Sequence, residues 1–339
     1  MNLLILESTC DETAAAVVND EFQVLGAAVA SQDELHRQFQ GVVPEIAARA
    51  HVERILPIID LTLSRAGITL QQIDAVAVAN TPGLAGSLVV GLVAAKTLCL
   101  TLGVPLIAIN HVHAHLYACQ LETAKPVFPA VGLVVSGGHT TLFDCQSSAE
   151  FNVLGGTIDD AAGEAFDKVA SMLGLPYPGG PVISRLARSG NRRAHSFPRS
   201  FAKEPRRLQF SFSGLKTAVR YALVGPGKPD FSQVKLSEQQ LADLAASFEE
   251  AVVECLVAKA RHALAHTGHR RLCVGGGVAA NTRLRELLRE AATVDDFELH
   301  IAPPTLCTDN AIMGAIAIER WRAGKLESLD LDIVPGLMR

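Results

Sequence analysis

The chain of 339 residues is 49% apolar and 19% charged, which predicts a large core, little disorder, and two domains or two lobes of one domain. A formal net charge of −5 argues against a wholly basic nucleic-acid binder but permits a local basic face. The 7 cysteines form no C-x-x-C pair, and Met1 runs directly into an apolar strand without a signal-peptide pattern, so we expect a reduced cytosolic protein without a thiolate zinc site.

The first predicted strand, at residues 4–6, opens a pattern that recurs 129 positions later, at residues 133–135. In each copy a strand, a polar loop and a second strand lead into a matching F-x-V-L-G segment, at 22–26 and at 151–155. One such match could arise by chance, but a constant offset across all the elements predicts a duplication that folds as two related lobes.

Each copy continues into helices and further strands, which predicts mixed sheets flanked by helices. The apolar region 75–109 is interrupted by Asn80, Pro82, Gly83 and Lys96, so we interpret it as core elements and not as a membrane span. In chain order, the expected elements are a helix at 44–66, a strand at 75–79, a helix at 88–102, a strand at 105–110, helices at 159–173 and 241–266, a strand at 272–274, a helix from Asn281, and a last helix at about 309–323.

Three histidines open a predicted helix directly after the strand at 105–110. His111 and His115 are four residues apart, so they share one helix face and can bind one metal ion, whereas His113 points elsewhere. The alternative is a set of histidines at a polar helix start. Asp309, which precedes another apolar helix, is either an N-cap or the third ligand of an open iron or zinc site.

Three loops follow predicted strands, where α/β sheets bind ligands: 7–11, 136–140 and 275–277. Glycines in two of them allow backbone N–H groups to approach an anion, and Ser136 and Thr140 add hydroxyl donors. Asn281 suits a ribose or purine edge. None of the loops matches a Walker or dinucleotide motif, and a glycine pair is often only a turn. Their equivalent placement in both lobes favours a nucleotide in a cleft between the lobes.

The predicted helix at 159–173 starts with carboxylates. Asp160, Glu164 and Asp167 share one face, which is either solvated or directed into the cleft, where Asp167 could bind ribose hydroxyls. The next turn, 178–181, has a bare backbone that could approach the same ligand.

Residues 185–220 contain ten Lys or Arg and a single acidic residue, Glu204, giving a net charge of +9. Phe197, Phe201, Phe210 and Phe212 are interleaved with the cations. One interpretation is a solvated basic face whose phenylalanines pack inward. The size of the asymmetry favours nucleic-acid contact.

Together, these residues resemble the superfamily of actin, heat-shock chaperones and sugar kinases, and more narrowly the TsaD family. The resemblance covers nearly the whole chain. It is carried by ordered motifs at 7–13, 41–45, 111–115, 135–140, 159–168, 177–181, 210–216, 275–278 and 307–310. It implies an α/β fold of two duplicated actin-like (RNase H-like) lobes with mixed sheets and a nucleotide cleft between them. The first lobe would be 1–110, completed by about 309–339, and the second 111–308, with a basic helical insertion at about 185–240.

The resemblance also implies an activity. Family members are metal-dependent acyltransferases that move a threonylcarbamoyl group from threonylcarbamoyl-AMP to the exocyclic amine of the adenosine 3′-adjacent to the anticodon, in tRNAs reading codons that begin with A. The implied metal is one divalent ion, iron with zinc as the alternative, on His111, His115 and Asp309. The implied substrate-binding residues are Val134, Val135, Ser136, Gly137, Gly138, Asp167, Gly180 and Asn281. Ser184 stands where many relatives have Asp, and Ser8–Thr9 reverses the more usual order.

Asp11 and Glu12 lie near the expected cleft and are candidates for accepting the amine proton. The implied partners are tRNA, a TsaB-like paralogue and a TsaE-like ATPase, with no membrane and a cytoplasmic location. Alternatives are an ATP-dependent kinase or chaperone-type ATPase of the same superfamily, a non-catalytic scaffold, or a metalloprotease, an older label for the family. The last is disfavoured because the histidine pair lacks the glutamate of H-E-x-x-H.

Overall fold

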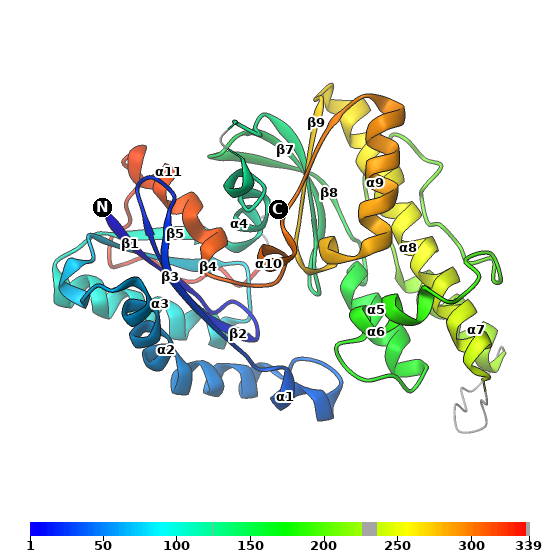
Figure 1. Ribbon diagram of the computed structural model, residues 1–339, viewed down its shortest axis with the longest axis horizontal. Coiled ribbons are helices and arrows are strands. Elements are labelled where there is room, and N and C mark those ends of the chain that lie inside the picture. Colours follow the sequence, from blue (N-terminus) through cyan, green and yellow to red (C-terminus); the bar gives the residue numbers. More distant parts are fainter. Residues whose placement is uncertain (124, 226–235, 337–339) are drawn as a thin grey trace. The chain divides into compact units, whose positions relative to one another are not determined.

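The computed structural model describes residues 1–123, 125–225 and 236–336 (Figure 1). The chain forms two compact units, each built around one mixed sheet of five strands. The first unit comprises residues 1–126, 148–150 and 305–339, and the second comprises 127–147 and 151–304.

The first unit has the strand order β3-β2-β1-β4-β5, with β1 in the centre. β1 pairs antiparallel with β2 and parallel with β4. The strands are β1 (Asn2–Glu7), β2 (Glu12–Asn19), β3 (Val24–Ser31), β4 (Ala75–Thr81) and β5 (Leu106–Asn110).

Alternate side chains of β1 enter different cores, as the period of a strand requires. Leu4 and Leu6 join the cluster that the helices α2 (Pro44–Ala66) and α3 (Ala85–Leu102) also line. Ile5 instead lies against the 3-10 helix η6 (Ile312–Ala315), where a Cβ on Gly314 would come within 2.6 Å of its side chain. The remaining helices of this unit are α1 (Asp33–His36), η1 (Arg37–Phe39), η2 (Leu70–Gln72), α4 (His111–Tyr117), η3 (Gln120–Glu122), α10 (Pro304–Cys307), whose first residue falls in the second unit, and α11 (Ile316–Arg322).

The second unit repeats this connectivity, with the order β10-β9-β6-β7-β8. Its central strand β6 pairs antiparallel with β7 and parallel with β9, as β1 does with β2 and β4. The expected duplication is therefore confirmed at the level of strand pairing. The strands are β6 (Ala130–Val135), β7 (Thr140–Ser147), β8 (Glu150–Gly156), β9 (Arg271–Gly275) and β10 (Glu298–Ile301).

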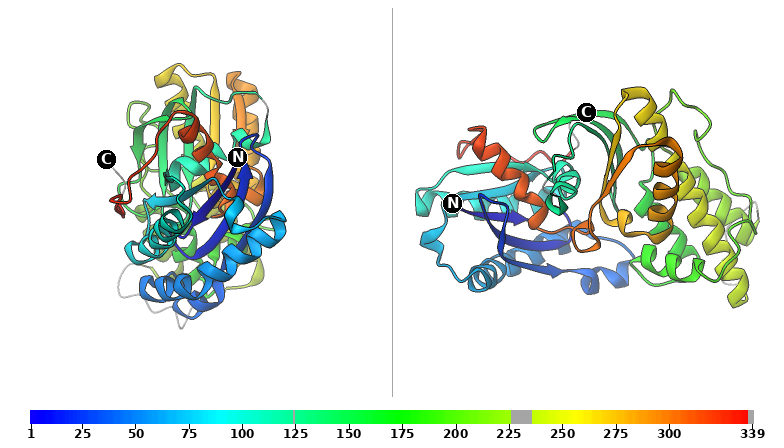
Figure 2. Two further views of the ribbon diagram at one scale, coloured as in Figure 1. Left: turned by 90° about the vertical axis from the view of Figure 1, so that its left-hand side faces the viewer. Right: turned by 45° about the horizontal axis from the view of Figure 1, so that its top comes forward.

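The 30-residue helix α8 (Glu238–Thr267) packs against the sheet of the second unit and against the helices α6 and α9; α8 and α9 lie side by side in Figures 1 and 2. Ser237 caps its N-terminus by accepting from the Gln240 backbone, and Gly268 ends it with φ of 75°. The other helices are α5 (Ala162–Met172), α6 (Gly179–Ala187), α7 (Ser213–Val224), η5 (Gly277–Ala280) and α9 (Thr282–Asp295).

Several element boundaries differ from the expected ones: α5, for example, begins at Ala162 and not at Asp159, so Asp160 precedes the helix. Three further details also differ from the sequence-based expectations. The last helix is not continuous from 309, because the Asn310 side chain accepts from the Met313 backbone and starts η6 three residues later. The described insertion has no helix between 188 and 212, where Gly190, Pro198 and Pro205 favour turns, and its residues 226–235 lie outside the described residues. The first unit also includes α4, which packs against β5 and η6, although the sequence analysis assigned residue 111 onward to the second lobe.

Within the described ranges, α3 is the one helix long and apolar enough to cross a membrane by length and composition, and 33% of it is buried. It packs against β4 and α2.

Candidate metal centre and nucleotide-binding loops

The end of β5 orients the helix that carries the histidines. Asn110 is the N-cap of α4, and its side-chain oxygen accepts from the backbone N–H groups of Val112 and His113. His111 and His115 then lie one turn apart, with ring centroids 4.7 Å from each other and exposures of 4% and 0%. The helix start therefore presents two buried imidazoles on one face, as the spacing predicts.

Asp309 completes the cluster. Its Oδ1 lies 3.1 Å from His115 Nε2 and 3.6 Å from His111 Nε2, and the three possible ligand atoms all lie within 4.8 Å of one another. Asp309 is not at the N-cap position of the following helix η6, which Ala311 occupies, and the Asn310 side chain accepts from the Met313 backbone of that helix. The structure thus brings together the three residues that the sequence analysis selected.

The position of Glu7, at the end of β1, fixes the orientation of His111. Glu7 Oε2 accepts from His111 Nδ1 at 3.0 Å, and Oε1 accepts from the Thr9 backbone at 2.8 Å. Burial acts to lower the pKa of His111, but the Glu7 and Asp309 carboxylates outweigh it and raise that pKa to about 9. Because the Nδ1–H group of His111 donates to Glu7, Nε2 is the ring nitrogen that is directed at Asp309. No sequence motif pointed to this role of Glu7, although a carboxylate that ends an apolar strand is a detectable signal.

The chemistry of this donor set fits a divalent transition metal. Two imidazole nitrogens and one carboxylate oxygen are an open set for iron or zinc, and a carboxylate behind a ligating histidine is the usual support for it. Among the described residues, none forms a hydrogen bond with His115 Nδ1, so Asp309 is what holds that ring.

Asp11 and Glu12, the two candidate proton acceptors, belong to the same unit and lie close to Asp33. Burial, Asp309 and Asp11 raise the pKa of Glu12 to about 11, which keeps its carboxyl group protonated at neutral pH. Burial also raises the pKa of Asp11, while a hydrogen bond with Cys10 lowers it. Of the two, Asp11 is the better candidate for a base.

In the second unit, the loop after β6 folds as a tight turn. The Ser136 backbone donates to His139 O at 2.7 Å, and Ser136 Oγ accepts from the His139 backbone. Thr140 was expected to offer a hydroxyl to a ligand, but it is fully buried and accepts from the Ala162 backbone at the start of α5. Val134 and Val135 are buried within β6, so they can offer a ligand only backbone groups.

Glycines allow the neighbouring loops to pack closely around this turn. A Cβ on Gly163 would lie 2.6 Å from Ser136 O, and one on Gly276, where φ is 94°, would lie 2.5 Å from Val135 O. β6 and β9 are parallel and end side by side, which brings their loops to one edge of the sheet.

Four other glycines in or next to these loops have no such explanation within the described residues. Gly137, Gly138, Gly180 and Gly277 have no positive φ, and a Cβ on any of them would meet no atom within 4 Å. Neither packing nor backbone conformation therefore requires glycine there. Close approach of a ligand to the bare backbone is a physical reason for it.

Adjacent glycines 179 and 180 provide a matched test. We expect Gly179→Ala to lower the free energy of unfolding by about 2 kcal/mol or more, because its Cβ would lie 2.4 Å from Ala170 Cβ. Gly180→Ala should leave the unfolding transition unchanged and weaken AMP binding instead. Denaturant unfolding and titration calorimetry measure the two effects. A Gly180→Ala variant that binds AMP normally would argue against ligand contact at this turn.

Asp167 and Asn281 have structural partners of their own. Asp167 Oδ1 accepts from the Gly179 backbone at 2.7 Å and so fixes the turn that starts α6. Asn281 caps α9 by accepting from the Leu284 backbone, and its Nδ2 donates to Ser184 Oγ and to Glu249 Oε1. Within the second unit, hydrogen bonds thus link α5, the start of α6 and the segment that precedes α9.

The predicted acidic face at the start of α5 is largely neutralised. Lys168 Nζ lies 2.8 Å from Asp160 and 2.7 Å from Glu164, and Lys216 lies 2.8 Å from Asp160. The carboxylates of Asp160 and Glu164 are therefore engaged by cations and do not share a ligand-facing role with Asp167.

The basic segment 185–220 has features of both interpretations, since some of its phenylalanines pack inward and some of its cations are free to contact a nucleic acid. Phe197, Phe210 and Phe212 are buried, and Arg199 pairs with Glu254 at 2.6 Å. Other cations of the segment are exposed and form no ion pair with any residue in the described ranges. These are Arg185, Arg188, Arg193, Lys203 and Arg206.

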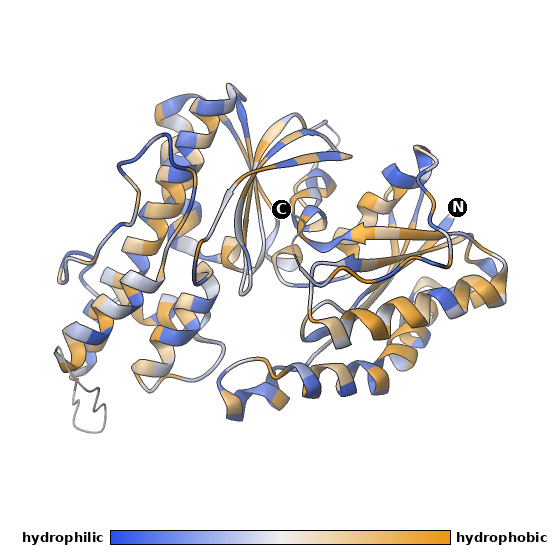
Figure 3. Cartoon of the chain, turned by 180° about the vertical axis from the view of Figure 1, so that it is seen from behind, coloured by the Kyte–Doolittle hydropathy of each residue, from blue (hydrophilic) through white to orange (hydrophobic). Residues whose placement is uncertain are grey.

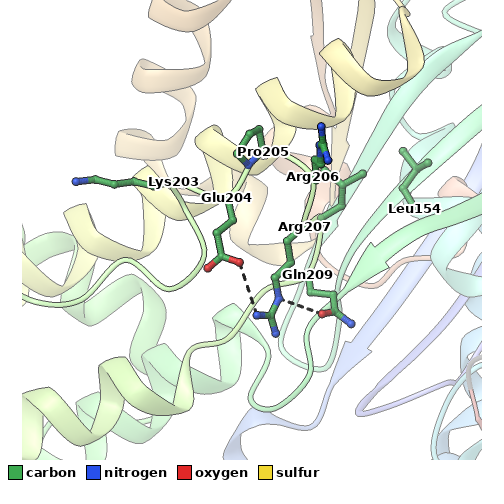
Figure 4. Close-up of a pocket in the computed structure, with 8 residues that line it drawn as sticks. Leu154, Lys203, Glu204, Pro205, Arg206, Arg207 and Gln209 are labelled. Atoms are coloured by element: carbon green, nitrogen blue, oxygen red, sulfur yellow. Dashed lines mark hydrogen bonds and ion pairs between the residues drawn. The ribbon is translucent and has the colours of Figure 1, made fainter.

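A cavity of about 820 Å³ lies beside this segment, lined by Leu154 and residues 203–209. Figure 4 shows that its cations diverge: Lys203 and Arg206 point in different directions, and Arg207 turns toward Glu204 and Gln209. The Arg207 guanidinium lies 3.4 Å above the centre of the Phe201 ring. The arrangement does not converge on a small anion and is better suited to an extended polyanion.

Comparison with known proteins adds independent evidence. Residues 23–316 match the family model described as TsaD, tRNA N6-adenosine threonylcarbamoyltransferase. Proteins with that name from Rhodopirellula baltica and Symbiobacterium thermophilum are 59% and 52% identical, over 99% of this chain and 97% and 96% of theirs.

Solved structures give the fold. HypF from T. kodakarensis aligns with a TM-score of 0.60 at 13% identity, over 95% of this chain and 48% of that one. The activator of the 2-hydroxyisocaproyl-CoA dehydratase from Clostridium difficile aligns with a TM-score of 0.54 at 12% identity, over 99% and 100% of the two chains. The expected α/β fold class with two actin-like lobes is confirmed.

Proposed function

The chain belongs to the TsaD family of tRNA N6-adenosine threonylcarbamoyltransferases, and we propose that its histidine–aspartate cluster and its glycine loops carry out that transfer. The enzyme transfers a threonylcarbamoyl group to the exocyclic amine of an adenosine in tRNA. The proposed donor is threonylcarbamoyl-AMP, and the proposed acceptor is the adenosine 3′-adjacent to the anticodon in tRNAs reading codons that begin with A. The observation that carries the proposal is the convergence of His111, His115 and Asp309.

The donor is a mixed anhydride, so its acyl group is already activated. The amine nitrogen forms a bond to the carbamoyl carbon, the bond from that carbon to the phosphate oxygen breaks, and AMP leaves with the electron pair. The backbone N–H groups of Gly137 and Gly138 and the Ser136 hydroxyl would bind the phosphate, while the Ser136 N–H holds the turn through His139 O. Asp11 would accept the proton that the amine loses.

His111, His115 and Asp309 would hold one divalent metal ion, iron or zinc, with Glu7 orienting His111. When bound, such an ion acts as a Lewis acid toward acyl oxygens. The protein's own contribution is to keep both Nε2 atoms and the carboxylate oxygen directed at one point before any ligand arrives.

The exposed cations of the basic segment suit the tRNA backbone. We expect a Lys203→Ala, Arg206→Ala variant to bind tRNA roughly tenfold more weakly and to reduce the slope of log affinity against log salt by about 2, since each lost phosphate contact releases about one fewer counterion. Filter binding across a salt series measures both.

Arg270→Ala is the matched control for the tRNA experiment. Arg270 is also an exposed arginine of the second unit, but it lies outside the basic segment and pairs with Asp296. An unchanged salt slope in the double variant would place the tRNA backbone elsewhere.

Partner proteins are proposed as well: a TsaB-like paralogue and a TsaE-like ATPase, all in the cytosol, where tRNA is found. The first unit offers exposed apolar side chains on α2 and α3, helices whose ribbons are in large part of the apolar colour in Figure 3. Val52 and Leu56 are each 64% exposed, Val93 is 56% exposed and Leu100 is 73% exposed. Apolar side chains gathered on adjacent helices are typical of protein–protein contacts.

Reconstitution tests the function directly. The protein is combined with purified tRNA, threonine, bicarbonate and ATP, the candidate partners are added one at a time, and modified nucleoside is measured by mass. We expect threonylcarbamoyladenosine to form only when this chain is present. ATP turnover with a sugar or unfolded protein, or metal-dependent peptide cleavage, with no modified tRNA under any combination, would reject the proposal in favour of a kinase, chaperone or protease.

A further inference from the structure

Helix α8 carries a buried carboxylate, Glu249, that none of the roles above uses. The residue is 5% exposed, and its Oε1 accepts hydrogen bonds from Ser184 Oγ and Asn281 Nδ2, both at 2.7 Å. Ser184 lies on α6, which begins at the Gly179–Gly180 turn, and Asn281 follows the loop after β9. Glu249 therefore lies behind two of the loops assigned to the adenylate.

The side chain of Asn281 has few hydrogen-bonding groups left for a ligand. The two donors of its amide go to Ser184 and Glu249, and one of its two acceptor positions caps α9 through Leu284 N. The Ser184 hydroxyl donates its proton in a hydrogen bond to Glu249. The group with unused capacity is Glu249, because no residue in the described ranges bonds to its second oxygen, Oε2.

The neighbouring residue Glu250 shows what a structural carboxylate looks like in this helix. Arg283 pairs with Glu250 through both of its oxygens, at 2.7 Å each. Glu249 has no ion pair with any described residue, although a buried carboxylate is costly without strong partners. Oε2 of Glu249 can therefore accept a hydrogen bond from a donor outside the chain.

We propose that Glu249 is a further substrate-binding residue, whose Oε2 accepts hydrogen bonds from the ribose hydroxyls of the bound adenylate. This rests on the proposed function, which assigns the adenylate to these loops. A carboxylate repels the phosphate and has no donor for the adenine ring nitrogens. The donors that remain are the ribose hydroxyls and the exocyclic amine; we assign Oε2 to the diol, and inosine monophosphate, which lacks the amine, separates the two. Ser184 and Asn281 are positioning residues that fix Oε1 and so direct Oε2.

The test compares the binding of AMP, 2′-deoxy-AMP, 3′-deoxy-AMP and inosine monophosphate to the full chain by calorimetry. The wild-type protein should bind AMP about tenfold more tightly than at least one deoxy analogue, the usual effect of one hydrogen bond to a charged group. Glu249→Ala should bind AMP about tenfold more weakly and should no longer distinguish the deoxy analogues. Glu249→Gln, which keeps the shape of the side chain, should lose part of this discrimination while remaining folded by circular dichroism.

Glu250→Gln is the matched control. It weakens the contact with Arg283, so its unfolding temperature should fall, but its discrimination between AMP and the deoxy analogues should equal that of the wild-type protein. Retained discrimination in Glu249→Ala would overturn the proposal, as would a change only in the ratio between AMP and inosine monophosphate, which would assign the carboxylate to the base.

The failures of this proposal and of the proposed function are separable. If the wild-type protein modifies tRNA but shows no preference for AMP over deoxy analogues, the assignment of Glu249 is overturned and the transferase function stands. If Glu249 controls ribose discrimination but no modified nucleoside forms in the reconstitution, the ribose contact stands and the transferase function is rejected.

Discussion

His111→Ala should release the bound metal and lower transferase activity by a factor on the order of a thousand, the equivalent of several kcal/mol of lost Lewis-acid assistance. The variant removes one of the three donors that meet within 4.8 Å, and it leaves Glu7 and Asp309 as buried or partly buried carboxylates without their imidazole partner. Metal content is measured by elemental analysis after dialysis, and activity by modified nucleoside per enzyme. Circular dichroism should show an intact fold, because α4 retains its Asn110 cap.

His113→Ala provides a control from the same turn of the same helix. His113 lies outside the group of converging ligand atoms, and burial, with a smaller contribution from Arg320, lowers its pKa to about 4, so it is neutral at pH 7. We expect normal metal content and normal activity from this variant. Full activity in a metal-free His111→Ala protein would contradict the assigned role of the metal.

The fold was largely predictable because its strongest signals are local or repeated. The helix expected at 44–66 is α2 with the same bounds, since Pro44 starts it and Gly67, in the left-handed region, ends it. The constant offset of 129 residues predicted two related sheets, and β1 and β6 do form equivalent pairings.

The pairing of side chains over long distances was less predictable. Asp309 could have been an N-cap, and only the folded chain shows that Ala311 is at the N-cap position of η6 while Asp309 meets His115 across 194 positions. The carboxylates at the start of α5 resembled a ligand face, but Lys216, 56 residues beyond Asp160, neutralises the first of them. Neither spacing nor propensity reports such contacts.

Residues that act through other residues were the hardest to find. Thr140 was expected to be a ligand donor because of its type and position, yet it caps α5. Glu249 lies within a helix whose other buried residues are mostly apolar, and its partners are 65 and 32 positions away. A pattern search selects residues that match a motif, whereas a supporting residue is defined by what it touches.

The largest effect from such a supporting residue is expected at Glu7. Glu7→Gln should weaken metal binding by a factor of about 10 to 100, the usual effect of losing a carboxylate behind a ligating histidine. The Glu7 carboxylate accepts from two donors, His111 Nδ1 and the Thr9 backbone, and an amide has only one oxygen with which to accept. Whichever way the glutamine turns, one of these donors faces an NH₂ group. If that donor is His111, its proton moves to Nε2, the atom needed as the ligand.

Competition with a chelator of known affinity measures this change, and transferase activity at saturating metal separates binding from chemistry. We expect activity to recover at high metal concentration in Glu7→Gln but not in His111→Ala, because the glutamine variant keeps all three donor side chains. Asp20→Asn is the matched control: it removes a carboxylate of the same unit that is 57% exposed and pairs with the chain's amino terminus instead of with a histidine. Equal metal affinity in Glu7→Gln and the wild-type protein would show that the hydrogen bond to Nδ1 does not set the ligand state of His111, and that packing alone orients the ring.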